Sequence, residues 1–235
     1  MNGSGAIRTE SLQVPRHALV ATLGPSGSAR GSVRELWYVL HGYAMRAVPF
    51  LEDCRAIDDG TRLLVAPEAL SRFYVGDEKA VSHRTAAVGA SWMTRDERDD
   101  EIADYTAYLD ALHAHVLASL GERAREVKVT VLGFSQGGAA AARWVAGGGV
   151  PAARLIVWGS AFAPELDLAS AGTPLRRAET VLVVGTTDRY ITPKVRNAEV
   201  ERVRSTGFPF RLVTFEGGHR LDDETLRALA GGPRG

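Results

Sequence analysis

The sequence predicts an α/β fold in which helices cover both faces of a mostly parallel central sheet. Short apolar runs of strand length alternate with segments of helical periodicity through most of the chain. Residues 62–66 have an apolar core without polar alternation, which indicates a strand buried on both faces, as in a parallel sheet. Because 235 residues suit one such unit and no repeat or linker divides them, we expect a single domain over residues 1–235.

The first part of the chain is predicted to supply three strands and a helix. Residues 1–14 are polar and contain glycine and serine, so we expect a loose lead-in. Two strands are predicted at residues 17–23 and 35–40, and we expect them to pair as a hairpin across a Gly/Pro/Ser loop. A helix over residues 44–54 then leads to the strand at residues 62–66.

Residues 68–92 lack a clear period and are predicted to form a long irregular loop, a feature that is often functional in a compact domain. Thr94 and Glu97 fit a capping box, which predicts that a helix begins there. Gly121 is expected to end it. A single apolar stripe runs along this helix at three- and four-residue steps: Ile102, Tyr105, Leu109, Leu112 and Val116.

The second half repeats the alternation of strand and helix. A strand ending near residue 132 is followed by a glycine-rich turn and an alanine-rich helix that ends at residues 147–149. The remaining predicted strands are residues 154–158, 180–184 and 210–215, and the remaining predicted helices are residues 193–205 and 222–230.

The glycine-rich turn reads Gly133-Phe134-Ser135-Gln136-Gly137 and is the strongest functional motif in the chain. Between a strand and a helix, this G-x-S-x-G pattern is typical of a nucleophile elbow, where a serine hydroxyl is exposed above the sheet. A Cβ at either glycine would clash with the neighbouring strand or helix. The alternative is an ordinary tight turn in which Ser135 only caps the helix.

Two other strand ends supply the partners that a serine nucleophile needs. Asp188 follows the strand at residues 180–184, and His219 follows the one at residues 210–215. A histidine accepts and returns the serine proton near neutral pH, while a carboxylate fixes the imidazole tautomer. Singly, Asp188 could form a turn and His219 could be a surface histidine. Other carboxylates in this half fit the position less well: Asp167, Asp222 and Asp223.

Together these motifs resemble those of the phospholipase/carboxylesterase group of α/β-hydrolases, which includes acyl-protein thioesterases and small bacterial carboxylesterases. The resemblance covers nearly the whole chain and is carried by Leu40-His41-Gly42, Gly133 to Gly138, Gly185-Thr186-Thr187-Asp188 with Thr192-Pro193, and Gly217-Gly218-His219. It implies the α/β-hydrolase fold and an oxyanion hole made by the N–H groups of Tyr43 and Gln136. Residues 91–93 resemble a tryptophan segment near the family's acyl site. Tyr43-Ala44-Met45 departs from the family pattern, so acyl-chain specificity is not carried over.

The sequence therefore predicts a serine hydrolase that cleaves carboxylic esters through Ser135, Asp188 and His219 and an acyl-enzyme, with no cofactor. Aromatic side chains are expected to shape the substrate pocket: Trp92, Phe73 and Tyr74. Thioesterase or lysophospholipase-type activity is the first alternative, since the same triad serves those reactions. The second is a ligand-binding protein without catalysis, since a fold does not dictate function.

Composition excludes several other classes of function. Lys plus Arg and Asp plus Glu both number 28, so net charge gives no case for nucleic acid or an anionic membrane. With one cysteine and no Cys/His cluster, we expect neither an internal disulfide nor a metal site. No apolar run reaches membrane-spanning length and no signal peptide is visible, so the expected location is cytoplasmic. We expect a small-molecule ester as the partner, and the sequence leaves a homodimer open.

Overall fold

The computed structural model describes residues 7–76, 85–170 and 172–231. The strands are β1 (Val20–Leu23), β2 (Glu35–Leu40), β3 (Arg62–Pro67), β4 (Ser71–Val75), β5 (Ala87–Ser91), β6 (Lys128–Phe134), β7 (Arg154–Trp158), β8 (Glu179–Gly185) and β9 (Arg211–Phe215). The α-helices are α1 (Ala47–Asp53), α2 (Arg98–Leu120), α3 (Gln136–Gly147), α4 (Pro174–Arg177), α5 (Pro193–Ser205) and α6 (Asp223–Ala230).

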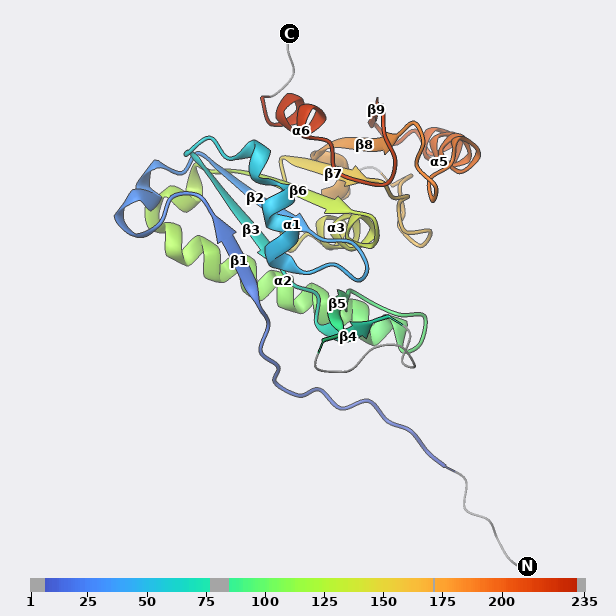
Figure 1. The fold of residues 1–235 in the computed structure, drawn as a ribbon, viewed down its shortest axis with the longest axis horizontal. Coiled ribbons are helices and arrows are strands. Elements are labelled where there is room, and N and C mark those ends of the chain that lie inside the picture. The colour runs from blue at the N-terminus through green and yellow to red at the C-terminus, as the bar shows by residue number, and fades with distance from the viewer. Residues whose placement is uncertain (1–6, 77–84, 171, 232–235) are drawn as a thin grey trace, which may run out of the picture.

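Seven strands form the central sheet in the order β1-β3-β2-β6-β7-β8-β9 (Figure 1). Every neighbouring pair is parallel except β1 and β3, so the predicted mostly parallel sheet is confirmed. The predicted hairpin between the first two strands is wrong, because β1 pairs antiparallel with β3 instead. Strand β2 is buried on both faces and lies between β3 and β6, whereas the partly exposed β1 occupies the edge.

Alternate side chains of each central strand enter two cores on opposite faces of the sheet. In β2, Leu36, Tyr38 and Leu40 join the core beneath α2 and α3, while Trp37 and Val39 join the core beneath α1 and α6. The helices accordingly cover both faces (Figure 1). Burial on both faces explains why the central strands lack polar alternation.

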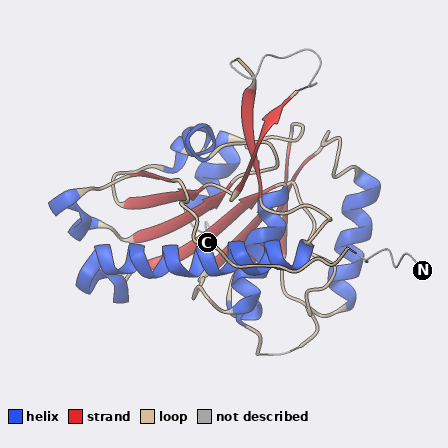
Figure 2. Cartoon of the chain, turned by 90° about the horizontal axis from the view of Figure 1, so that it is seen from below, coloured by secondary structure: helices blue, strands red, loops and turns tan. Residues whose placement is uncertain are grey.

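Part of the segment predicted as irregular is an antiparallel hairpin. Strands β4 and β5 pair from Ser71 with Ser91 to Val75 with Ala87, and Figure 2 shows them projecting from the main sheet. Residues 77–84, which include His83, lie outside the described residues. Because both strands are only five residues long and β5 is made mostly of small residues, their pairing is hard to recognise from sequence.

Helix α2 begins later than the capping box predicts. Its first residue is Arg98, and Glu97 precedes it in the left-handed region, with φ 48°. The N–H and the hydroxyl of Thr94 both donate to the Glu101 carboxylate, which ties the segment ahead of the helix to its first turn. The predicted apolar stripe is confirmed at Tyr105, Leu109, Leu112 and Val116, which are buried. In the part of the chain that the structure describes, no helix, α2 included, has the length and apolar character to cross a membrane.

Candidate active site

Ser135 lies in a strained turn between β6 and α3. Its φ of 53° and ψ of −122° are unusual for a residue with a side chain. A Cβ added at Gly133 would lie 2.1 Å from the Gly137 carbonyl oxygen, and one at Gly137 would lie 2.3 Å from that of Leu40. The N–H of Ser135 donates to the Trp158 carbonyl on the adjacent strand, at 2.8 Å. Both glycines are thus needed for the strand and the helix to pack around the serine, as the sequence predicts.

Asp188 and His219 meet at the ends of β8 and β9. The His219 Nδ1 and the Asp188 Oδ2 are 2.7 Å apart. The Oδ1 of Asp188 accepts from the N–H groups of Tyr190 at 2.8 Å and Ile191 at 2.9 Å. Burial by itself raises the pKa of Asp188, but these N–H groups and the imidazole outweigh it, so its pKa lies below the ordinary value. The ionised carboxylate therefore accepts from Nδ1–H of His219 and leaves Nε2 for another partner.

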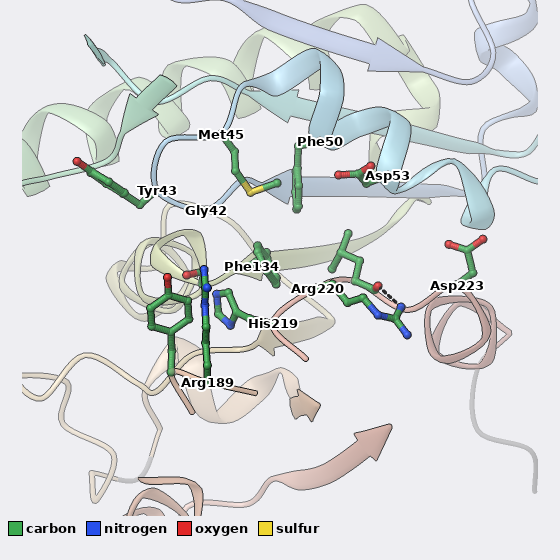
Figure 3. A pocket seen from close by; sticks show the side chains of 13 residues that line it. Gly42, Tyr43, Met45, Phe50, Asp53, Phe134, Arg189, His219, Arg220 and Asp223 are labelled. Carbon is green, nitrogen blue, oxygen red and sulfur yellow. Dashed lines mark hydrogen bonds between the residues drawn. The ribbon is translucent and has the colours of Figure 1, made fainter. Parts of the chain in front are cut away.

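The turn with Ser135 and the His219 ring line the same cavity, which has a volume of about 460 Å³. Met45, Phe50 and Phe134 form its apolar wall (Figure 3). The Phe134 ring also packs against the His219 ring at a centroid distance of 4.8 Å. The cavity therefore places a hydroxyl and an imidazole beside a surface that suits an apolar chain.

The loop after β2 lies directly against the serine turn. A Cβ added at Gly42 would lie 3.2 Å from the Ser135 Cβ. The buried His41 ring holds this loop in place, since its Nδ1–H donates to the Gly42 carbonyl at 2.7 Å and its Nε2 accepts from Ala69 N at 3.0 Å. Burial lowers the pKa of His41, which suits the neutral ring that these two bonds require. Tyr43 follows on this loop and lines the cavity.

Gln136 is the first residue of α3, where backbone N–H groups have no partner inside the helix. Its side chain binds the segment after β5: Oε1 accepts from Trp92 N at 2.9 Å, and Nε2 donates to the Met93 carbonyl at 2.7 Å. The side chain thereby anchors the first turn of α3, and this helix start lies next to Ser135.

The hairpin supports the loop that carries Tyr43. Ala44 N donates to the Ala90 carbonyl at 2.9 Å, and Ala90 N donates to the Met45 carbonyl at 3.1 Å. Ala44 has a φ of 62°, and a Cβ added at Gly89 would lie 2.6 Å from its carbonyl oxygen. The cavity-lining loop thus forms a short antiparallel bridge with β5 that requires a glycine at position 89.

The aromatic side chains that the sequence predicts for the substrate pocket do not line this cavity. Trp92 is only 2% exposed, and its indole N–H donates to the His41 carbonyl at 2.8 Å, which turns the ring into the core. The Phe73 ring does not line the cavity but stacks on the ring of Tyr43, which does, at a centroid distance of 5.1 Å. Tyr74 is exposed on the hairpin. The apolar lining comes instead from the loop after β2, α1 and the end of β6.

Three residues at the site are absent from the sequence prediction. Trp158 accepts from Ser135 N, and its indole N–H donates to the Arg220 carbonyl at 2.9 Å, so it joins the serine turn to the histidine loop. Arg189 and Tyr190 both line the cavity. The sequence offers a signal for each of them: Arg189 and Tyr190 directly follow Asp188 in the chain, and Trp158 lies at the end of a strand, where site residues are expected.

Metal ligands are not grouped near these residues. Across residues 7–76, 85–170 and 172–231, no three His, Cys, Asp or Glu side chains are placed to hold a metal ion.

Comparison with known proteins identifies the family. The family model described as "Serine hydrolase (FSH1)" matches residues 39–224. No curated protein matches the chain. Solved structures with the same fold include a carboxylesterase from Mesorhizobium loti (20% identity, 86% of this chain and 92% of that chain covered, TM-score 0.63) and acyl-protein thioesterase 2 from Zea mays (18%, 92% and 99%, 0.62). A phospholipase/carboxylesterase from Dyadobacter fermentans is similar at 13% identity, with 94% and 98% covered and a TM-score of 0.63.

These likenesses confirm the α/β-hydrolase fold and the resemblance that the sequence motifs carry. The matched region spans β2 to the start of α6 and contains all three of Ser135, Asp188 and His219. The chain belongs to the serine hydrolase (FSH1) family.

Proposed function

We propose that the protein is a serine esterase that cleaves carboxylic esters through Ser135, His219 and Asp188. The observation that carries this proposal is the 2.7 Å hydrogen bond between Asp188 and His219 at the wall of the cavity that Ser135 also lines. A buried carboxylate with a lowered pKa holds an imidazole in the tautomer whose free nitrogen is a base. This arrangement suits activation of a serine hydroxyl.

The reaction proceeds in two halves. The Oγ of Ser135 attacks the ester carbonyl carbon while Nε2 of His219 takes the hydroxyl proton. The tetrahedral intermediate collapses, the bond to the alcohol oxygen breaks, and His219 returns the proton to that oxygen. Water then attacks the acyl-enzyme with His219 again as base, which releases the acid and restores Ser135. Asp188 orients the imidazole and stabilises its charged form throughout.

The oxyanion is held by the backbone N–H groups of Tyr43 and Gln136. Support comes from the contact between Gly42 and Ser135 and from the position of Gln136 at the start of α3, where the helix dipole favours negative charge. The bonds of His41 and of the Gln136 side chain keep both backbone segments in place before substrate arrives. Preorganised donors of this kind provide much of the rate in acyl transfer.

The test combines a covalent label with turnover. A fluorophosphonate should modify Ser135, as read by peptide mass spectrometry, and the protein should hydrolyse p-nitrophenyl esters in a panel of increasing chain length. Thioesters of the same acyl chains, run alongside, test the thioesterase alternative. A folded protein that neither takes the label nor turns over any member of the panel contradicts the proposal.

Gly89→Ala is expected to lower kcat about 10- to 100-fold with KM little changed, because the new methyl pushes the Ala44 carbonyl and shifts the Tyr43 N–H. Steady-state kinetics on a short p-nitrophenyl ester measure this effect. Gly31→Ala is the matched control, since a Cβ there meets no atom within 4 Å. A Gly89→Ala variant with wild-type kcat would show that the hairpin does not position the oxyanion loop.

A further inference from the structure

Arg189 is held at the cavity by an aromatic contact that reaches the proposed base. Its guanidinium carbon lies 4.8 Å from the centroid of the Tyr190 ring, a cation–π distance. The Tyr190 ring in turn meets the His219 ring edge-on at 4.7 Å. Both Arg189 and Tyr190 line the cavity, and Figure 3 shows Arg189 beside His219. Stacking restricts the arginine side chain, so less entropy is lost when it binds a ligand.

Within the described part of the chain, the hydrogen-bond donors of Arg189 are not engaged by a carboxylate. Among the described residues no ion pair forms at Arg189, although it exposes its guanidinium beside the cavity. The other cavity-lining arginine, Arg220, differs, because it pairs with Asp222 at 3.2 Å and stacks on Phe215 at 5.5 Å. A planar guanidinium with free donors is suited to bidentate binding of a carboxylate.

Charge is distributed unequally along the cavity. Asp53 and Asp223 lie at the end away from Arg189 (Figure 3). The Asp223 carboxylate pairs with Arg227 at 3.3 Å, whereas burial and the neighbouring carboxylates Glu52 and Asp223 raise the pKa of Asp53. The arginines at that far end, Arg220 and Arg227, are already in ion pairs with Asp222 and Asp223, so the end with Arg189 is the one that suits an anionic group.

The position of His219 decides which half of an ester meets Arg189. The imidazole must protonate the departing alcohol oxygen, so the alcohol half lies on the His219 side of the serine. Tyr190 packs against that ring and against the Arg189 guanidinium, so Arg189 lies on the same side of the serine. The apolar wall of Met45 and Phe50 remains for the acyl half.

We propose that Arg189 is a specificity-determining residue that binds a carboxylate on the alcohol half of the substrate. The preferred substrate is then an ester with an apolar acyl chain and an alcohol half that carries a carboxylate. This inference rests on the proposed esterase function, and the experiment separates the two.

The test compares 4-(butyryloxy)benzoate with its neutral analogue 4-(butyryloxy)benzamide. We expect Arg189→Gln to lower kcat/KM for the charged ester about 10- to 100-fold, the usual effect of losing a hydrogen-bonded charge pair, and to change the neutral ester less than about 3-fold. Arg189→Lys should retain part of the preference, because it keeps the charge and loses the fork. Arg204→Gln, which removes an exposed arginine on α5, is the matched control and should leave both rates unchanged.

Equal effects of Arg189→Gln on the two esters would overturn the inference while leaving the esterase intact. Monophenyl succinate carries its carboxylate on the acyl half, and a selective loss confined to that ester would overturn the assignment to the alcohol half. If wild type cleaves none of these esters and p-nitrophenyl esters also remain intact, the proposed function fails and the inference with it.

Discussion

Ser135→Ala is expected to abolish ester hydrolysis while the protein remains folded. If the hydroxyl is the nucleophile, as we propose, its loss should lower kcat on the order of 10⁴- to 10⁶-fold. The measurement is turnover of a p-nitrophenyl ester by purified protein, with circular dichroism and thermal unfolding to establish the fold. Fluorophosphonate labelling should disappear in the same variant.

Stability should change little in Ser135→Ala, since alanine fills nearly the same volume and the backbone contacts of the turn remain. Ser160→Ala is a useful control, because Ser160 lies beside Gly138 near the same turn and does not line the cavity. Turnover close to wild type in a folded Ser135→Ala protein would remove the serine mechanism altogether.

Asp188→Asn is expected to lower kcat at pH 7 by roughly 10⁴-fold and to leave slow labelling of Ser135. An amide NH₂ facing Nδ1 favours the imidazole tautomer with its proton on Nε2, which cannot accept the serine proton. Kinetics over a range of pH and the labelling rate measure the effect. Asp167→Asn is the matched control, since Asp167 is exposed and its carboxylate accepts from Ala169 and Ser170 of its own turn.

The lowered pKa of Asp188 adds a second readout in acid. A carboxyl whose folded pKa lies below its unfolded value stabilises the native state above the unfolded value, near 3.9 for aspartate. That contribution is lost as the pH falls through the folded pKa. The difference in unfolding free energy between wild type and Asp188→Asn should therefore narrow as the pH is lowered from 7 toward 3. An active Asp188→Asn protein with an inactive Asp167→Asn would assign the acid elsewhere.

The sequence predicts the sheet and the position of the candidate triad because both depend on local signals. Ser135 directly follows an apolar strand, Asp188 and His219 come within four residues of the end of theirs, and the carboxyl ends of parallel strands meet at one edge of a sheet. The Asp188–His219 bond is thus a consequence of strand order that can be foreseen from motif order. Gly133 and Gly137 are equally local, since their small size is demanded by the turn that contains them.

Features that depend on contacts between distant segments are not predicted. Strand β2 lies between β3 and β6 in the sheet, so β1 pairs with β3 at the edge and not with β2. No residue near β1 indicates this strand order. Trp92 resembles a pocket residue by its motif, yet its indole N–H is taken by the His41 carbonyl in the core. The lining by Met45 and Phe50 arises because α1 lies over the edge where β6 ends, which only the packed structure defines.

The two hydrogen bonds of Trp158 also make this residue an optical reporter of the site. Trp158 is 1% exposed. Its carbonyl accepts from the Ser135 N–H, and its indole N–H donates to the Arg220 carbonyl. Indole fluorescence responds to the polarity and hydrogen bonding of its surroundings, so a shift of the histidine loop changes the emission of this one tryptophan. Trp37 and Trp144 are buried in the two cores, whereas Trp92 is hydrogen-bonded to His41 and Gln136, so a variant with Trp92→Phe isolates the signal of Trp158 from a second tryptophan near the site. The proposed acylation of Ser135 should therefore be visible as a time-dependent change in this emission, without a chromogenic substrate.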